Sequence, residues 1–225
     1  MAEERSATTD KVRSAEIVAA LCLASDLAMG LPLEHGLQST LIAMRLGQRL
    51  EIDAETASDT YYACLLFHAG CTADAEAASD LFGTDNSLLT EFVPVMFGTR
   101  RDTIGGVMRA LASPDDAPLV RAGHMVRRLP RAARLHKRHT VAACQVAQML
   151  SERLGVRPQV RALFAYLTER WDGKGDPGKA AGDELPLAVR IAHVARDAAV
   201  QQMLGGEERA TRVVRQRAGA PSIRP

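Results

Sequence analysis

Apolar positions recur about every 3.6 residues along most of the chain, the spacing that places side chains on one face of an α-helix. The sequence has neither a clear alternating strand pattern nor an Asn-Gly hairpin signal. The pattern therefore predicts an all-α fold arranged as a helical bundle. The expected helices are 14–29, 33–51, 53–69, 73–81, 87–112, 130–154, one from Pro158, one from Pro186, and 207–217.

The predicted helix ends follow from residues that cap a helix or interrupt it. Asp53 is expected to cap the helix that follows it. Pro130, Pro158 and Pro186 are each expected to open a helix, because the N–H that proline lacks has no partner in the first turn anyway. We expect a disordered N-terminal tail (1–13), one helical domain (14–205), and a charged C-terminal helix and tail (206–225).

Composition and charge narrow the class of protein. The 225 residues are 47% hydrophobic, enough to bury a core, and carry a formal net charge of +1. This charge and the 4% of aromatic residues disfavour nucleic-acid binding. There is no apolar run of about 18 residues and no signal peptide, so no membrane span is expected. The four cysteines have no paired spacing, which disfavours a disulfide framework and favours a cytoplasmic protein.

Two histidines occupy equivalent places in two predicted helices. His35 and His139 each stand near the start of an apolar helical stripe, so both are expected to face the core. A buried histidine needs only one good hydrogen-bond partner. Packed core histidines and metal ligands are therefore both open interpretations.

One segment carries a specific motif. It is Glu169-Arg170-Trp171-Asp172-Gly173-Lys174-Gly175-Asp176-Pro177, followed by Gly182-Asp183-Glu184-Leu185-Pro186. The segment resembles the signature of the HD-GYP family of metal-dependent phosphohydrolases. The resemblance implies an HD-domain-like helical bundle in which histidines and aspartates hold two or three iron or manganese ions. In that family the metals activate a water that attacks a phosphodiester, typically that of cyclic di-GMP.

The sequence departs from this pattern at decisive positions. The His-Asp pair reads Phe67-His68, and the late metal aspartate falls on Arg196, with Asp197 one residue out of register. A cation at that position repels a metal ion, so a two-metal centre is not expected. We expect no cofactor; the open alternative is one divalent ion (zinc, iron or manganese) on His35, His68 and His139.

The motif itself has a structural and a phosphate-binding interpretation. Lys174 and Arg190 are candidate phosphate contacts, although a solvated basic loop explains them as well. The other residues are expected to shape the loop. Trp171 is expected to anchor it in the core, and Asp172 to cap it through hydrogen bonds. Gly173 and Gly175 permit a positive φ, and Pro177 fixes the backbone where the chain leaves the loop.

These observations favour a catalytically silent HD-GYP-like module for regulation or protein interaction, whose partner is another protein or a second copy of the chain. The alternative is a phosphodiesterase or other phosphohydrolase, or a receptor, for cyclic di-GMP or another phosphoester at an altered metal site. A helical scaffold without a ligand is a third option. The basic stretch 121–138 is interpreted as a solvated or protein-docking face rather than a nucleic-acid site.

Overall fold

The computed structural model describes residues 13–71, 93–111, 117–175 and 178–218, and every element in these ranges is a helix. The prediction of an all-α fold is therefore confirmed. Residues 1–12 of the predicted tail 1–13, the predicted helix 73–81 and Pro177 lie outside the described residues. The elements are α1 (Ser14–Ala28), α2 (His35–Arg49), α3 (Ala54–Leu65), η3 (Val93–Val95), α5 (Arg100–Leu111), α6 (Pro118–Arg153), α7 (Pro158–Leu163), η4 (Phe164–Tyr166), η5 (Gly182–Glu184) and α8 (Leu187–Ala218).

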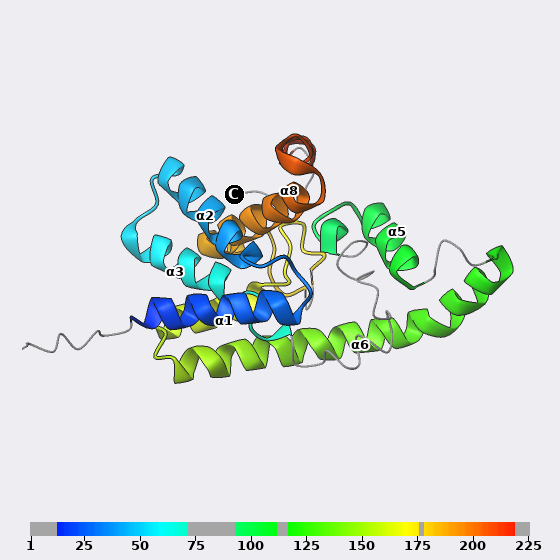
Figure 1. The fold of residues 1–225 in the computed structure, drawn as a ribbon, viewed down its shortest axis with the longest axis horizontal. Helices are drawn as coiled ribbons and strands as arrows, with labels where there is room; N and C mark the ends of the chain where they lie inside the picture. The colour runs from blue at the N-terminus through cyan, green and yellow to red at the C-terminus, as the bar shows by residue number, and fades with distance from the viewer. Residues whose placement is uncertain (1–12, 72–92, 112–116, 176–177, 219–225) are drawn as a thin grey trace, which may run out of the picture.

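The helices pack around two neighbouring cores. The larger core joins α1, the end of α3, α6 and α7, with Val18, Ala147 and Phe164 fully or nearly fully buried in it. The second core joins α2, α3 and the first part of α8 through Ala43, Cys64 and small apolar residues of α8. Figure 1 shows α2 and α3 beside α8, while α1 and the long α6 run along the other side of the bundle.

Local chemistry explains several of the observed helix ends. Asp53 caps α3 as predicted, because its Oδ1 accepts hydrogen bonds from the backbone N–H groups of Glu55 and Thr56, both at 2.9 Å. Pro158 is the first residue of α7, also as predicted. Pro186 directly precedes α8, and its carbonyl accepts from the N–H groups of Val189 and Arg190. The prediction for Pro186 was thus one residue early.

The predicted start of a helix at Pro130 is wrong, because Pro130 lies inside α6. A proline within a helix leaves the carbonyl four residues earlier without its partner, usually at a cost of about 3 kcal/mol or more. Here that carbonyl belongs to Val126, whose residue is 76% exposed, and Pro130 is exposed as well. Water can hydrate the carbonyl at this outer face, so the helix continues through the proline.

The predicted final helix is the second part of α8. The backbone leaves the helical conformation at Gly205 and Gly206, and Gly206 adopts a φ of 72° that suits glycine. The second part then returns to the body of the protein, where Arg217 pairs with Asp197. None of the described helices has both the length and the apolar content needed to cross a bilayer.

Candidate functional site

A buried polar cluster lies where α1, α2, the turn after α3 and α8 meet. Its members are Asp26 in the last turn of α1, His35 at the start of α2, His68 after α3, and Arg196 in α8. All four residues are less than 9% exposed. The rings of His35 and His68 are stacked, with their centroids 5.9 Å apart and their planes inclined by 30°. The fold thus brings together two of the three predicted histidines.

The α1–α2 junction fixes one side of this cluster. Asp26 Oδ2 accepts a buried hydrogen bond of 2.9 Å from the N–H of Gly36, one of the backbone donors in the first turn of α2 that have no partner within the helix. A Cβ on Gly36 would lie 2.3 Å from the sulfur of Cys22, so only glycine allows this approach. The preceding residue, Glu34, takes a φ of 75°, which is uncommon for a residue with a side chain. The turn thereby directs His35 inward.

Arg196 binds His68 directly. Its Nε donates a hydrogen bond of 3.1 Å to His68 Nε2, and its guanidinium lies over the ring of Phe67, 4.0 Å from the centroid. Because an arginine Nε only donates, His68 Nε2 must accept and the ring proton must reside on Nδ1. That Nδ1 is 3.8 Å from Oδ1 of Asp26. His68 therefore stands between a guanidinium and a carboxylate as a neutral imidazole.

Burial controls the protonation of the cluster. Burial, together with the neighbouring His68 and Arg196, lowers the pKa of His35 to about 4, although Asp26 opposes the shift. Burial and Arg196 likewise lower the pKa of His68 to about 4. Burial also lowers the pKa of Arg196, to about 10, which still leaves it a cation at neutral pH. Both imidazoles are neutral at that pH.

The metal centre that the HD-GYP resemblance implies does not fit the described residues. Arg196 occupies the Nε2 lone pair of His68 and places a positive charge beside it. Nowhere in the described ranges do three or more histidine, cysteine or acidic side chains gather closely enough to hold a metal ion. Two buried acceptors of the cluster, Asp26 Oδ1 and His35 Nε2, make no hydrogen bond. We therefore derive no metal-dependent step.

The third predicted ligand is not placed by the structure. His139 belongs to α6, but its side chain lies outside the described residues. The set of His35, His68 and His139 therefore remains a prediction.

Asp197 does not replace the missing carboxylate. Its Oδ1 pairs with Arg217 and accepts from Gln201 Nε2 at 3.3 Å. Arg217 also donates to the carbonyl of Pro94 at 2.7 Å. One residue along a helix turns the side chain by about 100°, which directs Asp197 toward the C-terminal part of α8 rather than toward His68. Its role is to fasten that part to the body.

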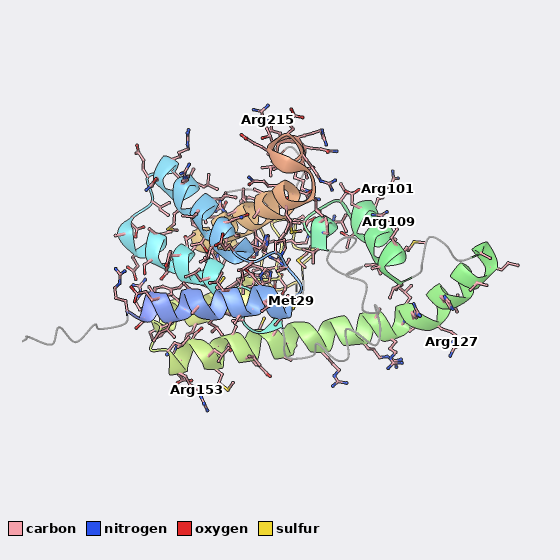
Figure 2. The ribbon with its side chains drawn as sticks, viewed as in Figure 1. Met29, Arg101, Arg109, Arg127, Arg153 and Arg215 are labelled. Atoms are coloured by element: carbon pink, nitrogen blue, oxygen red, sulfur yellow. The ribbon has the colours of Figure 1, made fainter. Side chains whose placement is uncertain are left out.

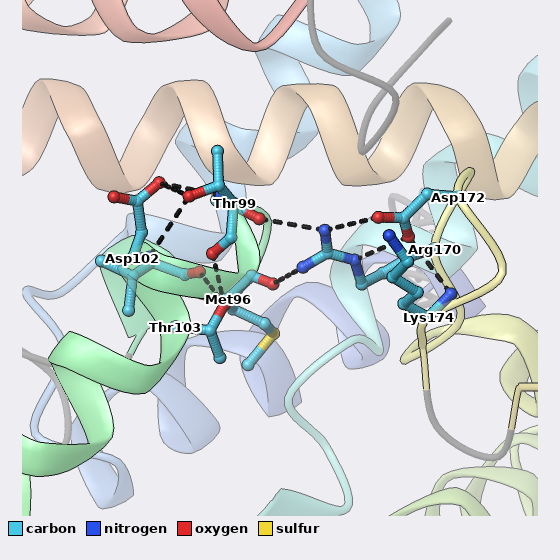
Figure 3. A network of polar contacts seen from close by, with 9 residues as sticks. Met96, Thr99, Asp102, Thr103, Arg170, Asp172 and Lys174 are labelled. Carbon is cyan, nitrogen blue, oxygen red and sulfur yellow. Dashed lines mark hydrogen bonds and ion pairs between the residues drawn. The ribbon is translucent and has the colours of Figure 1, made fainter.

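The signature segment is held by two buried charged residues. Glu169 accepts from the N–H groups of Gly178 at 3.0 Å and Lys179 at 2.7 Å. Arg170 forms a bidentate ion pair with Asp172, in which two guanidinium N–H groups donate to the two carboxylate oxygens, each at 3.0 Å. Its other donors bind the carbonyls of residues 96 and 98, each at 2.9 Å (Figure 3). Arg170 therefore joins the loop to the segment before α5.

Figure 3 also shows how the far end of that segment is fixed. Thr99 and Asp102 form reciprocal hydrogen bonds at the start of α5, with Thr99 N donating to Asp102 Oδ2 at 2.8 Å. Thr103 Oγ1 donates to the carbonyl of Val95 at 3.0 Å. The guanidinium of Arg170 thus meets a segment that is anchored on both sides.

Glycines allow the loop to approach its own stem. A Cβ on Gly175 would lie 2.4 Å from Cα of Glu169, and Gly173 has a φ of 69°. Asp172 also accepts from the N–H of Lys174 at 3.2 Å. These contacts place Asp172, Gly173 and Gly175 within the loop, and their role in shaping it remains a prediction.

The two candidate phosphate contacts have different surroundings. The guanidinium of Arg190 lies 4.6 Å from the ring centroid of Trp171 and pairs with Asp183 at 3.1 Å. Lys174 is exposed. Arg190 thus packs against the loop and Lys174 lies at the surface; phosphate binding by either remains a prediction.

Sequence reasoning missed Asp26 as a member of the site. A carboxylate interrupting an otherwise apolar helical stretch was the available signal, because such a residue is buried only with a partner. It also passed over His193 of α8, which is buried and whose Nε2 lies 3.0 Å from the carbonyl of Leu167. The contact between Arg196 and His68 spans 128 residues and has no local signal.

The chain is similar in sequence to a protein of known activity. No protein-family model matches the chain. The chain is 25% identical over 207 residues to 3'3'-cGAMP-specific phosphodiesterase 3 of Vibrio cholerae serotype O1, covering 91% of this chain and 44% of that protein. It therefore spans less than half the length of this relative.

A solved structure agrees with that comparison. The crystal structure of a cyclic GMP-AMP specific phosphodiesterase of V. cholerae, V-cGAP3, matches with a TM-score of 0.59 and 24% identity, over 91% of this chain and 44% of the other. The likeness shows the fold, an all-α, HD-domain-like bundle.

The comparison corrects the expected function. We expected a catalytically silent module for regulation or protein interaction, and that expectation is wrong, since the similar protein is a phosphodiesterase named for a cyclic dinucleotide. The finding supports the alternative, action on a cyclic dinucleotide. It does not support the expectation that no cofactor is used.

Proposed function

We propose that this chain is a domain of the cyclic-dinucleotide phosphodiesterase type that acts on a cyclic dinucleotide through an altered site. The observation that carries the proposal is the alignment of 91% of the chain with 3'3'-cGAMP-specific phosphodiesterase 3. The HD-GYP resemblance of the segment from Glu169 to Pro177 supports the same substrate class. Cyclic di-GMP and 3'3'-cGAMP are the ligands to test first, because both contain two phosphodiesters in a ring.

The altered feature is the source of positive charge. A phosphodiester carries one negative charge, which metal ions or guanidinium groups can bind. In this chain Arg196 supplies a fixed cation beside His68, whose other ring nitrogen faces Asp26. We assign Arg196 the role of holding the positive potential toward which the phosphodiester is drawn, since it remains protonated at neutral pH.

Binding and hydrolysis are tested on the same preparation. Radiolabelled 3'3'-cGAMP and cyclic di-GMP are added to the purified chain, with and without manganese or ferrous iron, and free, bound and linearised nucleotide are separated. The expected result is saturable binding of at least one cyclic dinucleotide, with a linear dinucleotide as the product of turnover. A chain that neither retains nor cleaves either nucleotide, with or without metal, contradicts the proposal.

A receptor that binds the nucleotide without cleaving it is the second candidate. The hydrogen bond from Arg196 to His68 favours it, because this bond engages an imidazole that would otherwise be available to a metal. Recovery of intact nucleotide from the bound fraction, even after prolonged incubation with metal, supports the receptor. Release of linear product supports the phosphodiesterase.

A further inference from the structure

Two cysteines far apart in sequence flank a close backbone contact. A Cβ on Gly70 would lie 1.9 Å from the carbonyl oxygen of Ala143 and 2.7 Å from its Cα, so the backbones of these residues touch. Cys71 and Cys144 are the next residues on the two segments. The fold thus brings the turn after α3 against α6 at a point where a cysteine is the next residue on each segment.

The same two cysteines differ from the others in access. Cys71 and Cys144 are partly exposed, whereas Cys22 and Cys64 are buried, and all four are free thiols. Burial raises the pKa of Cys64 to about 12 and that of Cys22 to about 12. The first pair is therefore more accessible to a solution reagent than the second.

Cys71 also lies within electrostatic reach of two groups. Burial raises its pKa most, the thiol of Cys144 raises it further, and the Arg196 guanidinium opposes the rise by stabilising the thiolate. Its N–H donates to the carbonyl of His68 at 2.9 Å. Cys71 therefore connects the α6 contact with the polar cluster.

We propose that Cys71 and Cys144 are a reversible redox modification site, which closes to a disulfide when the chain meets a low-molecular-weight disulfide such as oxidised glutathione. One thiolate attacks oxidised glutathione and forms a mixed disulfide, releasing one glutathione. The second cysteine then displaces the other glutathione. The two cysteines lose two electrons and two protons in total, and one glutathione disulfide becomes two glutathione molecules.

The bridge would tie the turn that carries His68 to α6. Since Cys71 follows His68 by three residues and lies near Arg196, its oxidation also removes a thiol from beside that guanidinium. The modification therefore acts at the edge of the candidate site and not at a distant surface.

The full chain is incubated with oxidised glutathione, its remaining thiols are alkylated, and its intact mass and peptides are measured. The expected result is a species lighter than the reduced chain by two hydrogens, a peptide pair joining Cys71 to Cys144, and reversal by dithiothreitol. Cys71→Ser and Cys144→Ser should each abolish this species, whereas Cys22→Ser should leave it unchanged.

Three results would overturn the proposal. They are a bridge that uses Cys22 or Cys64, a stable glutathione adduct on Cys71 that does not proceed to a bridge, and full alkylation of both thiols after oxidation. Circular dichroism on each variant verifies that the helical fold is retained. Where a serine variant does not fold, peptide mapping of the wild-type chain decides alone.

Discussion

Arg196 Nε donates a hydrogen bond of 3.1 Å to His68 Nε2, at the centre of the buried cluster. The resemblance to HD-GYP proteins places a metal-binding aspartate at position 196 and a bridging aspartate at position 68. At these two positions this chain carries a cation and an imidazole, which form a hydrogen bond with each other. Burial and the neighbouring guanidinium keep His68 neutral, and Arg196 is the cation of the cluster, balanced by the carboxylate of Asp26.

Replacement of Arg196 should affect stability only modestly when the new side chain is apolar. Arg196→Met removes a buried cation, with the desolvation cost of that charge, and keeps much of the volume. It also leaves His68 Nε2 unpaired, so we expect a loss of about 1–2 kcal/mol in the free energy of unfolding. Arg196→Asp should cost about 3–5 kcal/mol, because it places a carboxylate without a cationic partner in a buried site.

Urea denaturation at pH 7 measures both effects, with Arg153→Met on the outer face of α6 as the control. Figure 2 shows Arg153 and Arg127 on the outside of that helix, and both residues are exposed. The control should change stability by less than about 0.5 kcal/mol. Equal losses for Arg196→Met and Arg196→Asp would contradict this account of the cluster.

His193 should make stability depend on acid pH. Burial lowers its pKa to about 4, with Arg196 contributing, and the ring contacts the uncharged rings of Phe67 and Phe97. The unfolded chain binds this proton below its ordinary pKa of about 6.5, while the folded chain does not bind it until about pH 4. The stabilisation is therefore fully present above pH 6.5 and is lost as the pH falls toward 4, by about 1 kcal/mol per pH unit.

Denaturation curves collected between pH 7 and pH 4.5 check the slope. His193→Gln retains a donor for the carbonyl of Leu167 but does not titrate. Its stability should fall less steeply with acid than that of the wild type. Identical slopes for the two proteins would show that folding does not lower the pKa of His193.

Arg170 should be essential for the stability of the signature segment. Arg170→Ala leaves the carbonyls of residues 96 and 98 and the carboxylate of Asp172 without their donor, so we expect a loss of about 3–5 kcal/mol. Arg170→Lys keeps the charge but not the bidentate geometry, and should recover only part of the lost stability. Thermal unfolding provides the measurement, and a lysine variant as stable as the wild type would contradict the role of the planar guanidinium.

Two glycine-to-alanine changes should have opposite effects on the free energy of unfolding. In Gly175→Ala the new Cβ meets the backbone of Glu169 at 2.4 Å, so we expect a loss of about 1–3 kcal/mol. In Gly123→Ala the new Cβ, within α6, meets nothing within 4 Å, so the helix should gain about 1 kcal/mol. Chemical denaturation of both variants tests the pair, and a neutral Gly175→Ala would show that the loop can shift away from its stem.

The helices could be predicted wherever a local signal decides the structure. The apolar period, the carboxylate of Asp53 and the proline at position 158 act within one or two turns, and the structure confirms them. Pro130 failed as a signal because its effect depends on whether the carbonyl of Val126 is hydrated, which is a property of the tertiary surface.

The site was less predictable because its decisive contacts are distant in sequence. Arg196 was expected only to repel a metal ion, and the structure shows that it also has a partner in His68. Asp26 enters the cluster through the N–H of Gly36, a contact that depends on the turn between α1 and α2. Neither contact follows from periodicity or motif spacing, so the residues were visible in the sequence but their relationship was not.

Isothermal titration of 3'3'-cGAMP and cyclic di-GMP into the wild-type chain and into Arg196→Met tests the central claim most directly. Loss of one charge-assisted contact should weaken binding by about tenfold to a hundredfold, while Arg153→Met should bind as the wild type does. Equal affinity of the wild type and folded Arg196→Met would contradict the assignment of Arg196 as the cation that draws the phosphodiester.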